Sequence, residues 1–171
     1  LFEFEGLTPQ MIVALAEELN APILTTFKGK GLVPDDHPLA CGVLGRSGTP
    51  IASWFMNEAD LLLVLGASFS NHTGITPKKP TIQVDFDPLA LGRFHPIDVP
   101  LLGELSTTVA ALRGGLAGGA TSVDPRSEVA ERRAIWTAEK AKRRGADQSN
   151  GIASAVLFDE LQRAVDDDAV I

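Results

Sequence analysis

The feature that most constrains this chain is the sequence ADLLLVLGASFSN at residues 59–71. Five consecutive apolar residues, 61–65, are ended by Gly66. A strand with one wet face alternates apolar and polar residues, whereas a run that is apolar at every position is typical of a strand buried on both faces. Five residues are also too few for a typical helix. The run therefore predicts a central strand of a parallel sheet in an α/β fold.

The residues that follow this strand predict a binding edge. Ligands of open parallel sheets bind beyond the carboxyl ends of the strands, where Gly66 is followed here by small and polar residues. A second predicted strand, residues 81–85, ends in Asp85. In nucleotide-binding α/β folds an acidic residue at about this position accepts hydrogen bonds from the ribose hydroxyls. An alternative is that Gly66 and Asp85 have no role in ligand binding, because strands of any doubly wound domain end in Gly and Asp. No GxGxxG run occurs that would favour nucleotide binding.

Helices and strands alternate along the first two thirds of the chain. Thr8-Pro9 and Thr49-Pro50 each pair an N-cap residue with a first-turn proline, which predicts a helix at both places. The remaining elements predicted before residue 117 are a strand at 23–26, a short helix at 87–92, an edge strand at 99–102 and a helix at 105–116. This alternation predicts parallel strands joined by right-handed crossovers.

Two glycine-rich segments are candidates for contacts with phosphate. Residues 27–31 (FKGKG) place two glycines beside two lysines, but the spacing is not that of a P-loop, and a chain reversal with solvated lysines is the favoured interpretation. Residues 42–48 (GVLGRSG) lead into the helix that begins after Thr49. A helix N-terminus presents free N–H groups and a positive dipole end, which favour an anion.

Composition and charge exclude several classes of protein. The formal net charge is −7 and no basic face is evident, which argues against binding of nucleic acid. No apolar stretch is long enough for a membrane helix. Cys41 is alone, so no disulfide framework exists and a reducing, cytoplasmic setting is expected. His37, His72 and His95 lack the spacing of metal ligands, so no metal site and no catalytic residue are predicted.

The chain is predicted to have three parts. Residues 1–116 form the α/β domain, and residues 117–148 form a linker, rich in glycine at its start, and a charged helix at 126–144. Residues 149–171 contain one further helix and stop where a strand begins. We therefore expect a fragment whose parent protein continues.

Four sequence blocks resemble the central domain of thiamine-diphosphate-dependent enzymes, in particular acetolactate synthase, pyruvate oxidase and 2-oxo acid decarboxylases. In chain order they are LAEELNAPILTTFKGKG, VPDDHPLACGVLGRSGT, EADLLLVLGASFSN and IQVDFDP. The resemblance implies a Rossmann-like doubly wound domain without catalytic residues, within a homo-oligomeric parent that acts on a 2-oxo acid such as pyruvate. The parent would hold thiamine diphosphate and Mg²⁺ in two flanking domains, the second of which residues 149–171 would open. No GDG segment occurs here, so the fragment alone should be inactive.

The resemblance also implies a cofactor-binding edge, because flavin-containing members hold FAD in extended form on this domain. Glycines at positions 48 and 66 would let a ring or a phosphate approach the backbone. The matching positions in this chain are Thr26, Phe27, Arg46, Ser47, Gly48, Gly66, Ala67, Ser68, His72, Asp85, Phe86, Asp87 and Gly103.

The chain departs from the flavin-binding pattern at four of these positions. Arg46-Ser47 stands where that pattern has a methionine-histidine pair, and Arg46 could restore one positive charge. Where flavin-binding synthases read GARFDDR, this chain reads GASFSNH, so Ser68 and His72 replace two arginines. Each lost charge-assisted hydrogen bond to the FAD pyrophosphate would be worth about 1.5–3 kcal/mol. FAD binding therefore stays open but is not favoured. The alternatives are a free-standing nucleotide-binding module of the same fold and a purely structural interaction domain.

Overall fold

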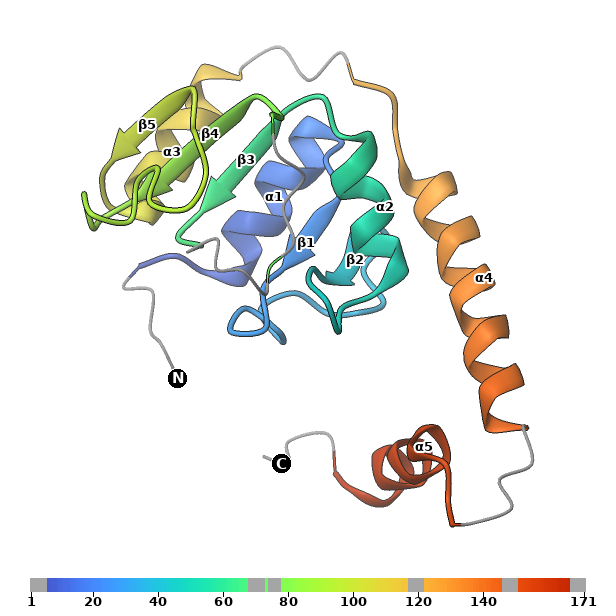
Figure 1. The fold of residues 1–171 in the computed structure, drawn as a ribbon. Helices are drawn as coiled ribbons and strands as arrows, with labels where there is room; N and C mark the ends of the chain where they lie inside the picture. The colour runs from blue at the N-terminus through green and yellow to red at the C-terminus, as the bar shows by residue number, and fades with distance from the viewer. Residues whose placement is uncertain (1–5, 68–72, 74–77, 117–121, 146–150, 167–171) are drawn as a thin grey trace. The chain divides into compact units, whose positions relative to one another are not determined.

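The computed structural model describes residues 6–67, 73, 78–116, 122–145 and 151–166 of the 171 residues (Figure 1). The chain divides into two compact units, Leu1–Ala130 and Glu131–Ile171, and each is considered by itself. Among the helices of these described ranges, none is both long enough and apolar enough to cross a membrane.

The first unit alternates helices and strands, as the sequence predicts, and thereby confirms the α/β class. One long helix begins in this unit and continues into the second, which also contains the last helix. The elements are α1 (Pro9–Leu19), β1 (Ile23–Thr25), β2 (Ala40–Val43), α2 (Pro50–Glu58), β3 (Leu62–Leu65), β4 (Thr81–Asp85), β5 (Val99–Leu102), α3 (Leu105–Gly115), α4 (Arg126–Arg144) and α5 (Ser154–Ala164).

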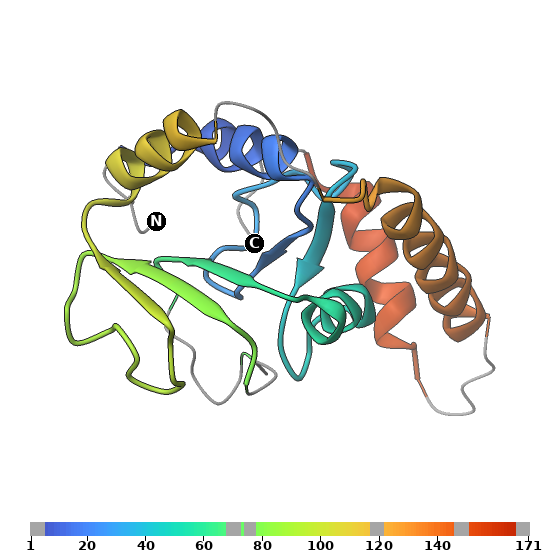
Figure 2. The same ribbon diagram turned by 90° about the horizontal axis from the view of Figure 1, so that it is seen from above.

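All strand pairs of the described chain are parallel. They form a two-stranded sheet, β1-β2, and a three-stranded sheet, β3-β4-β5, so β5 lies at an edge as its proline predicts. Helix α2 packs on β2, while α1 packs beside α3, and Figure 2 shows α1 and α3 in one layer. The two sheets and these helices form the scaffold that positions the carboxyl ends of the strands.

The predicted helix caps are confirmed. The Thr8 Oγ1 accepts from the Met11 N–H at 3.3 Å, and the Thr49 Oγ1 accepts from the Ala52 N–H at 3.1 Å. Each hydroxyl satisfies one of the donors that a helix leaves unpaired at its N-terminus. Helix α1 ends at Asn20, which adopts the left-handed conformation with φ of 50°.

The prediction that the apolar run is buried on both faces is correct for only one face of β3. Leu62 and Val64 are buried, whereas Leu63 and Leu65 are half-buried, and Leu61 precedes the strand and is exposed. The register places Leu65 opposite Val84, on the face that α3 covers. The helical layer covers this face only partly at β3, so the side chains on it keep some contact with solvent.

Two local predictions were wrong. Strand β2 was not predicted, because one of its four residues is Gly42 and the segment therefore resembled a glycine-rich loop. In the structure Gly42 has φ of +84°. Residues 87–92 form successive turns instead of a helix, with the Leu89 N–H donating to Asp87 Oδ1 at 2.9 Å and the Ala90 N–H donating to the Asp87 carbonyl at 3.0 Å. The side chain and the carbonyl of Asp87 thus both hold the first of these turns.

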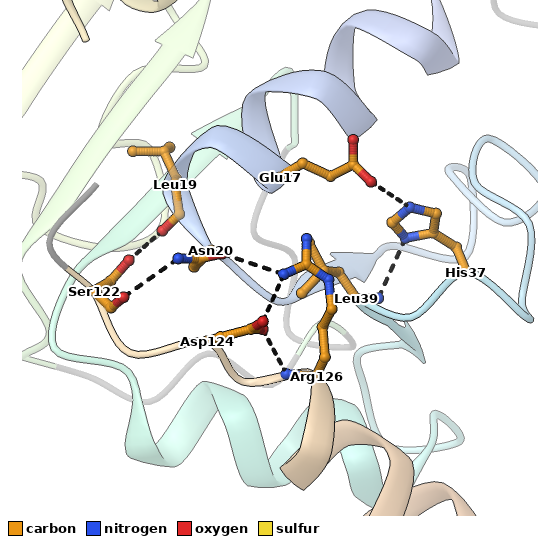
Figure 3. Close-up of polar contacts among 8 residues, drawn as sticks. All are labelled: Glu17, Leu19, Asn20, His37, Leu39, Ser122, Asp124 and Arg126. Carbon is orange, nitrogen blue, oxygen red and sulfur yellow. Dashed lines mark hydrogen bonds and ion pairs between the residues drawn. The ribbon is translucent and has the colours of Figure 1, made fainter. Parts of the chain in front are cut away.

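The segment before α4 is fastened to the end of α1 by a group of polar contacts (Figure 3). The Ser122 hydroxyl donates to the Leu19 carbonyl, and the Asn20 side chain donates to the Ser122 carbonyl at 3.3 Å. Arg126 donates to both the Asn20 Oδ1 at 3.3 Å and the Asp124 Oδ2 at 2.8 Å. The sequence predicted a linker here, and the contacts show that its last part is held in place.

The first turn of α4 continues this attachment. The Trp54 indole N–H on α2 donates to Glu128 Oε1 at 2.8 Å, and Val129 is fully buried. Within the second unit, Arg144 forms an ion pair with Asp159 of α5 at 2.5 Å. The predicted helix of residues 149–165 is shorter in the structure, because α5 begins only at Ser154.

Candidate functional site

Asp85 lies at the carboxyl end of β4, where the sequence places it. The residue is buried, and its Oδ1 accepts from the Asp87 N–H at 3.0 Å. Its carbonyl accepts from the Gly103 N–H at 3.0 Å. The structure therefore brings Asp85, Asp87 and Gly103 together, and it fixes the orientation of a carboxylate that can accept from sugar hydroxyls.

The end of β3 adjoins this group. The Gly66 N–H donates to the Val84 carbonyl at 2.9 Å, and Gly66 has φ of +60°, which favours glycine. Ala67 follows and is half-buried. Ser68 and His72, the two positions that differ most from flavin-binding relatives, lie outside the described residues.

Thr26, at the end of β1, closes a tight turn. Its hydroxyl and its carbonyl both accept from the Gly29 N–H, at 3.2 Å and 3.0 Å. Lys30 forms an ion pair with Asp35, and Phe27 is exposed. These contacts support a chain reversal at residues 27–31, with the Lys30 charge already paired by a neighbouring carboxylate.

The loop between β2 and α2 is compact and holds its glycine for a structural reason. The Gly48 N–H donates to the Gly45 carbonyl at 2.9 Å, and a Cβ atom at Gly48 would come within 2.1 Å of the Val43 carbonyl oxygen. Gly48 is therefore required because its backbone packs closely against β2. Arg46 and Ser47 are exposed at the tip of the loop, where they can contact a ligand.

The N-terminus of α3, beside Gly103, is occupied by the chain's own carboxylate. Glu104 accepts from the backbone N–H groups of Ser106 and Thr107 at 2.8 and 2.7 Å, and from their hydroxyls at 2.6 and 2.8 Å. The hydroxyl of Ser106 contributes most to lowering the pKa of Glu104 to about 2, followed by the Thr107 and Ser106 backbone N–H groups. A second anion at this helix end would meet a charge of its own sign. This contact was not predicted from the sequence, because Glu is not among the residues preferred at a helix N-cap.

The predicted residues form two groups in the structure. Thr26 and Phe27 lie near the loop that carries Arg46, since the Leu44 N–H donates to the Thr25 carbonyl at 2.8 Å. The second group is formed by Gly66, Ala67, Asp85, Phe86, Asp87 and Gly103. Among the strands that the structure describes, no pairing joins the two sheets that carry these groups. An apolar hollow elsewhere, between β5 and α3, includes none of them; it is lined by Leu101, Thr108, Ala111, Leu112, Gly115 and Leu116.

No cluster of three or more metal-ligating side chains occurs in the part of the chain that the structure describes. His37 has a structural role instead: its Nδ1 accepts from the Leu39 N–H at 3.3 Å, and its Nε2 lies 3.5 Å from Glu17 Oε1 (Figure 3).

Comparison with known proteins identifies the family. The sequence model for "Thiamine pyrophosphate enzyme, central domain" matches residues 8–112, which is more than half of the chain. The chain belongs to this family. Its parallel α/β unit is the Rossmann-like central domain, and thiamine diphosphate is the cofactor that gives the family its name.

The curated relatives are much longer proteins. The chain is 36% identical over 110 residues to a probable acetolactate synthase large subunit of Methanocaldococcus jannaschii, covering 61% of this chain and 19% of the relative. It is 40% identical over 91 residues to the putative thiamine pyrophosphate-containing protein YdaP of Bacillus subtilis, covering 53% and 16%. It is 36% identical over 112 residues to the acetolactate synthase isozyme 2 large subunit of Escherichia coli, covering 61% and 20%.

Proposed function

We propose that this chain is the central, non-catalytic domain of a thiamine-diphosphate-dependent enzyme that acts on a 2-oxo acid such as pyruvate. The observation that carries the proposal is the match of residues 8–112 to the family's central domain, together with about one third identity to acetolactate synthases. Thiamine diphosphate would supply the electron sink of the reaction. It would be held with Mg²⁺ by flanking domains of the parent, as the resemblance to the family implies.

In this proposal residues 1–116 are the Rossmann-like domain, residues 117–148 connect it to the next domain, and residues 149–171 open the diphosphate-binding domain. The contacts of Asn20 with Ser122 and Arg126 support the connecting role, because they hold the segment before α4 against the end of α1. The parent would be a cytoplasmic homo-oligomer. The single cysteine, Cys41, is buried and its thiol donates to the Leu39 carbonyl at 3.6 Å, which is compatible with a reducing compartment.

We also propose a weak nucleotide site at the carboxyl edge of the strands, for FAD or ADP. Asp85 supports the ribose contact by its position at the carboxyl end of β4, where its Oδ1 accepts from the Asp87 N–H. For the pyrophosphate, the exposed Arg46 is the cation that the predicted site offers, while Glu104 disfavours an anion near Gly103. Ser68 and His72 supply only neutral or partly charged hydrogen bonds where relatives supply guanidinium groups.

Titration of the 171-residue chain tests both statements. We expect no binding of thiamine diphosphate with Mg²⁺ in calorimetry, and weak binding of FAD in a fluorescence titration. The double variant Ser68→Arg, His72→Arg should bind FAD about tenfold more tightly if 1.4 kcal/mol is recovered, and Arg46→Ala should bind more weakly than the wild type.

Two outcomes contradict the proposal. Micromolar binding of thiamine diphosphate would place a cofactor site within this chain. Equal FAD affinity of the wild type and both variants would mean that the edge does not use these positions, and the purely structural interaction domain would then be the better explanation.

A further inference from the structure

Strands β1 and β3 each have one edge without a neighbouring strand. Among the strands that the structure describes, β1 pairs only with β2, and β3 pairs only with β4. Figure 1 shows β1 and β3 as the facing members of the two sheets, with their arrows pointing the same way. An unpaired strand edge presents a row of N–H and carbonyl groups, which is a template for pairing with a further strand.

The backbone groups on the open edge of β1 belong to Leu24. Ile23 and Thr25 make backbone hydrogen bonds of 2.8 Å toward the β2 side. Successive residues of a strand direct their backbone groups to opposite edges, so the N–H and the carbonyl of Leu24 point away from β2.

On β3 the open edge is formed by Leu63 and Leu65. The Leu62 N–H donates to the Pro80 carbonyl at 2.8 Å, and two turns of the pleat further on the Gly66 N–H donates to the Val84 carbonyl at 2.9 Å. Both bonds lie on the β4 side, so the backbone groups of the residues between them alternate toward the opposite edge.

We name Leu24, Leu63 and Leu65 the inner strand edges. All three residues are half-buried. Backbone N–H and carbonyl groups that are removed from water need hydrogen-bond partners, because leaving them unpaired costs free energy. The inner strand edges therefore favour the addition of a strand.

The chain that precedes α1 arrives where such a strand would end. Helix α1 followed by β1 is the second half of a strand–helix–strand unit, in which the first strand runs parallel to the second. Gly6 has φ of +84° and lies against the first turn of α3, since a Cβ atom at Gly6 would be 2.8 Å from the Ser106 Oγ. Helix α3 begins just after the carboxyl end of β5, so a strand that ends before Gly6 would run toward the same edge as the other strands.

Residues 1–5, which lie outside the described residues, have a suitable length and sequence pattern (LFEFE). Five extended residues span roughly 17 Å. In a strand, Phe2 and Phe4 would lie on one face and the two glutamates on the other. The phenylalanines could then pack beside the half-buried leucines, while the glutamates remain in contact with solvent.

We propose that residues 1–5 bind to the inner strand edges as a parallel strand and join the two sheets of the first unit into one. The added strand would also set the spacing between the two groups of predicted site residues, because one group follows β1 and the other follows β3. The two strands would then lie roughly 10 Å apart, which is twice the usual distance between paired strands. The proposal goes beyond the proposed function and requires no cofactor, so its test is independent of the titrations with thiamine diphosphate and FAD.

NMR spectroscopy of the 171-residue chain tests the pairing directly. We expect nuclear Overhauser effects from the backbone protons of residues 2–4 to Leu24 on one side and to Leu63 or Leu65 on the other. The Leu63 and Leu65 amides should also exchange with solvent within about tenfold of the rate of Leu62, whose N–H is already paired with the β4 side.

Two variants place the same new side chain on the two faces of the segment. Phe4→Gln should speed amide exchange at the inner strand edges at least tenfold and lower the thermal midpoint by several degrees, because a packed aromatic side chain is lost. Glu3→Gln, on the face that remains in solvent, is the matched control and should leave both quantities unchanged.

The contacts of the wild-type chain decide the proposal even if Phe4→Gln fails to fold. Residues 2–4 that show no contact with β1 and β3 would overturn it. Contacts found only between two differently labelled copies in a mixed sample would also overturn it, because the position would then be filled by a second chain. Equal effects of Phe4→Gln and Glu3→Gln would contradict the predicted orientation of the segment.

Discussion

The two sheets of the first unit differ in how completely their apolar residues are buried. Around β1 and β2, Leu39, Cys41 and Ala52 are almost completely inaccessible to solvent, and α2 packs directly on β2. Around β4 and β5, one face is covered by a loop, and Phe86 and Leu102 remain exposed. The second region also has fully buried side chains, such as Val84, but hydrogen bonds of Gln83 and Glu104 fix its loop and the start of α3. A substitution of the same kind should therefore have different effects in the two regions.

The largest difference is expected for leucine truncation. Leu39→Ala removes a fully buried side chain of the first region and should lower the free energy of unfolding by about 2–5 kcal/mol. Leu102→Ala, at an exposed position of the second region, should change it by less than about 0.5 kcal/mol. Urea unfolding at a concentration where the chain is monomeric measures both. Equal losses would show that Leu102 is packed as closely as Leu39.

Alanine substitutions at two glycines, one in each region, compare how closely the backbone is packed. In Gly48→Ala the new Cβ would lie 2.1 Å from the Val43 carbonyl oxygen, so the loop must move, at a cost of about 1–3 kcal/mol. Gly114→Ala near the end of α3 meets no atom within 4 Å and should be neutral or stabilising by up to about 1 kcal/mol. Thermal midpoints that fall in both variants would contradict the steric argument.

The smallest effect concerns Glu104 and pH. Its pKa is lowered from 4.5 to about 2 in the folded chain, so its contribution is present above pH 4.5 and is lost as the pH falls towards 2. The difference in the free energy of unfolding between the wild type and Glu104→Gln should therefore become smaller as the pH decreases from 4.5 towards 2. A carboxyl titration by NMR checks the pKa directly, and a value near 4.5 for Glu104 would remove the basis of the prediction.

Periodicity and capping signals predicted the helices and most strands, because these features depend on neighbours in the chain. Thr8, Thr49 and Pro100 were interpreted correctly for that reason. Strand β2 was missed because parallel pairing with β1 is a long-range interaction, and Gly42 carries no apolar side chain to indicate a strand. The half-exposed face of β3 was missed because coverage by a helical layer cannot be inferred from the strand's own sequence.

The predicted site was only partly accessible to the same reasoning. Asp85 and Gly103 could be placed because strand ends meet at one edge of a parallel sheet. The carboxylate of Glu104 at the start of α3 could not be assigned from the strand pattern, because its position depends on the side-chain conformations of Ser106 and Thr107. Gln83 likewise appeared as an ordinary strand residue, although its contacts with Ala90 and Gly92 decide the shape of the following loop.

The bond between Trp54 and Glu128 has a spectroscopic consequence. The chain contains two tryptophans and no tyrosine, so its near-ultraviolet emission comes from Trp54 and Trp136. Trp54 belongs to the first compact unit and donates to a carboxylate, whereas Trp136 belongs to the second and lies beside the Arg143 guanidinium, 5.3 Å from the ring centre. Each unit thus has its own fluorophore in a different electrostatic environment. Replacing either tryptophan by phenylalanine leaves a chain whose emission reports the unfolding of one unit alone.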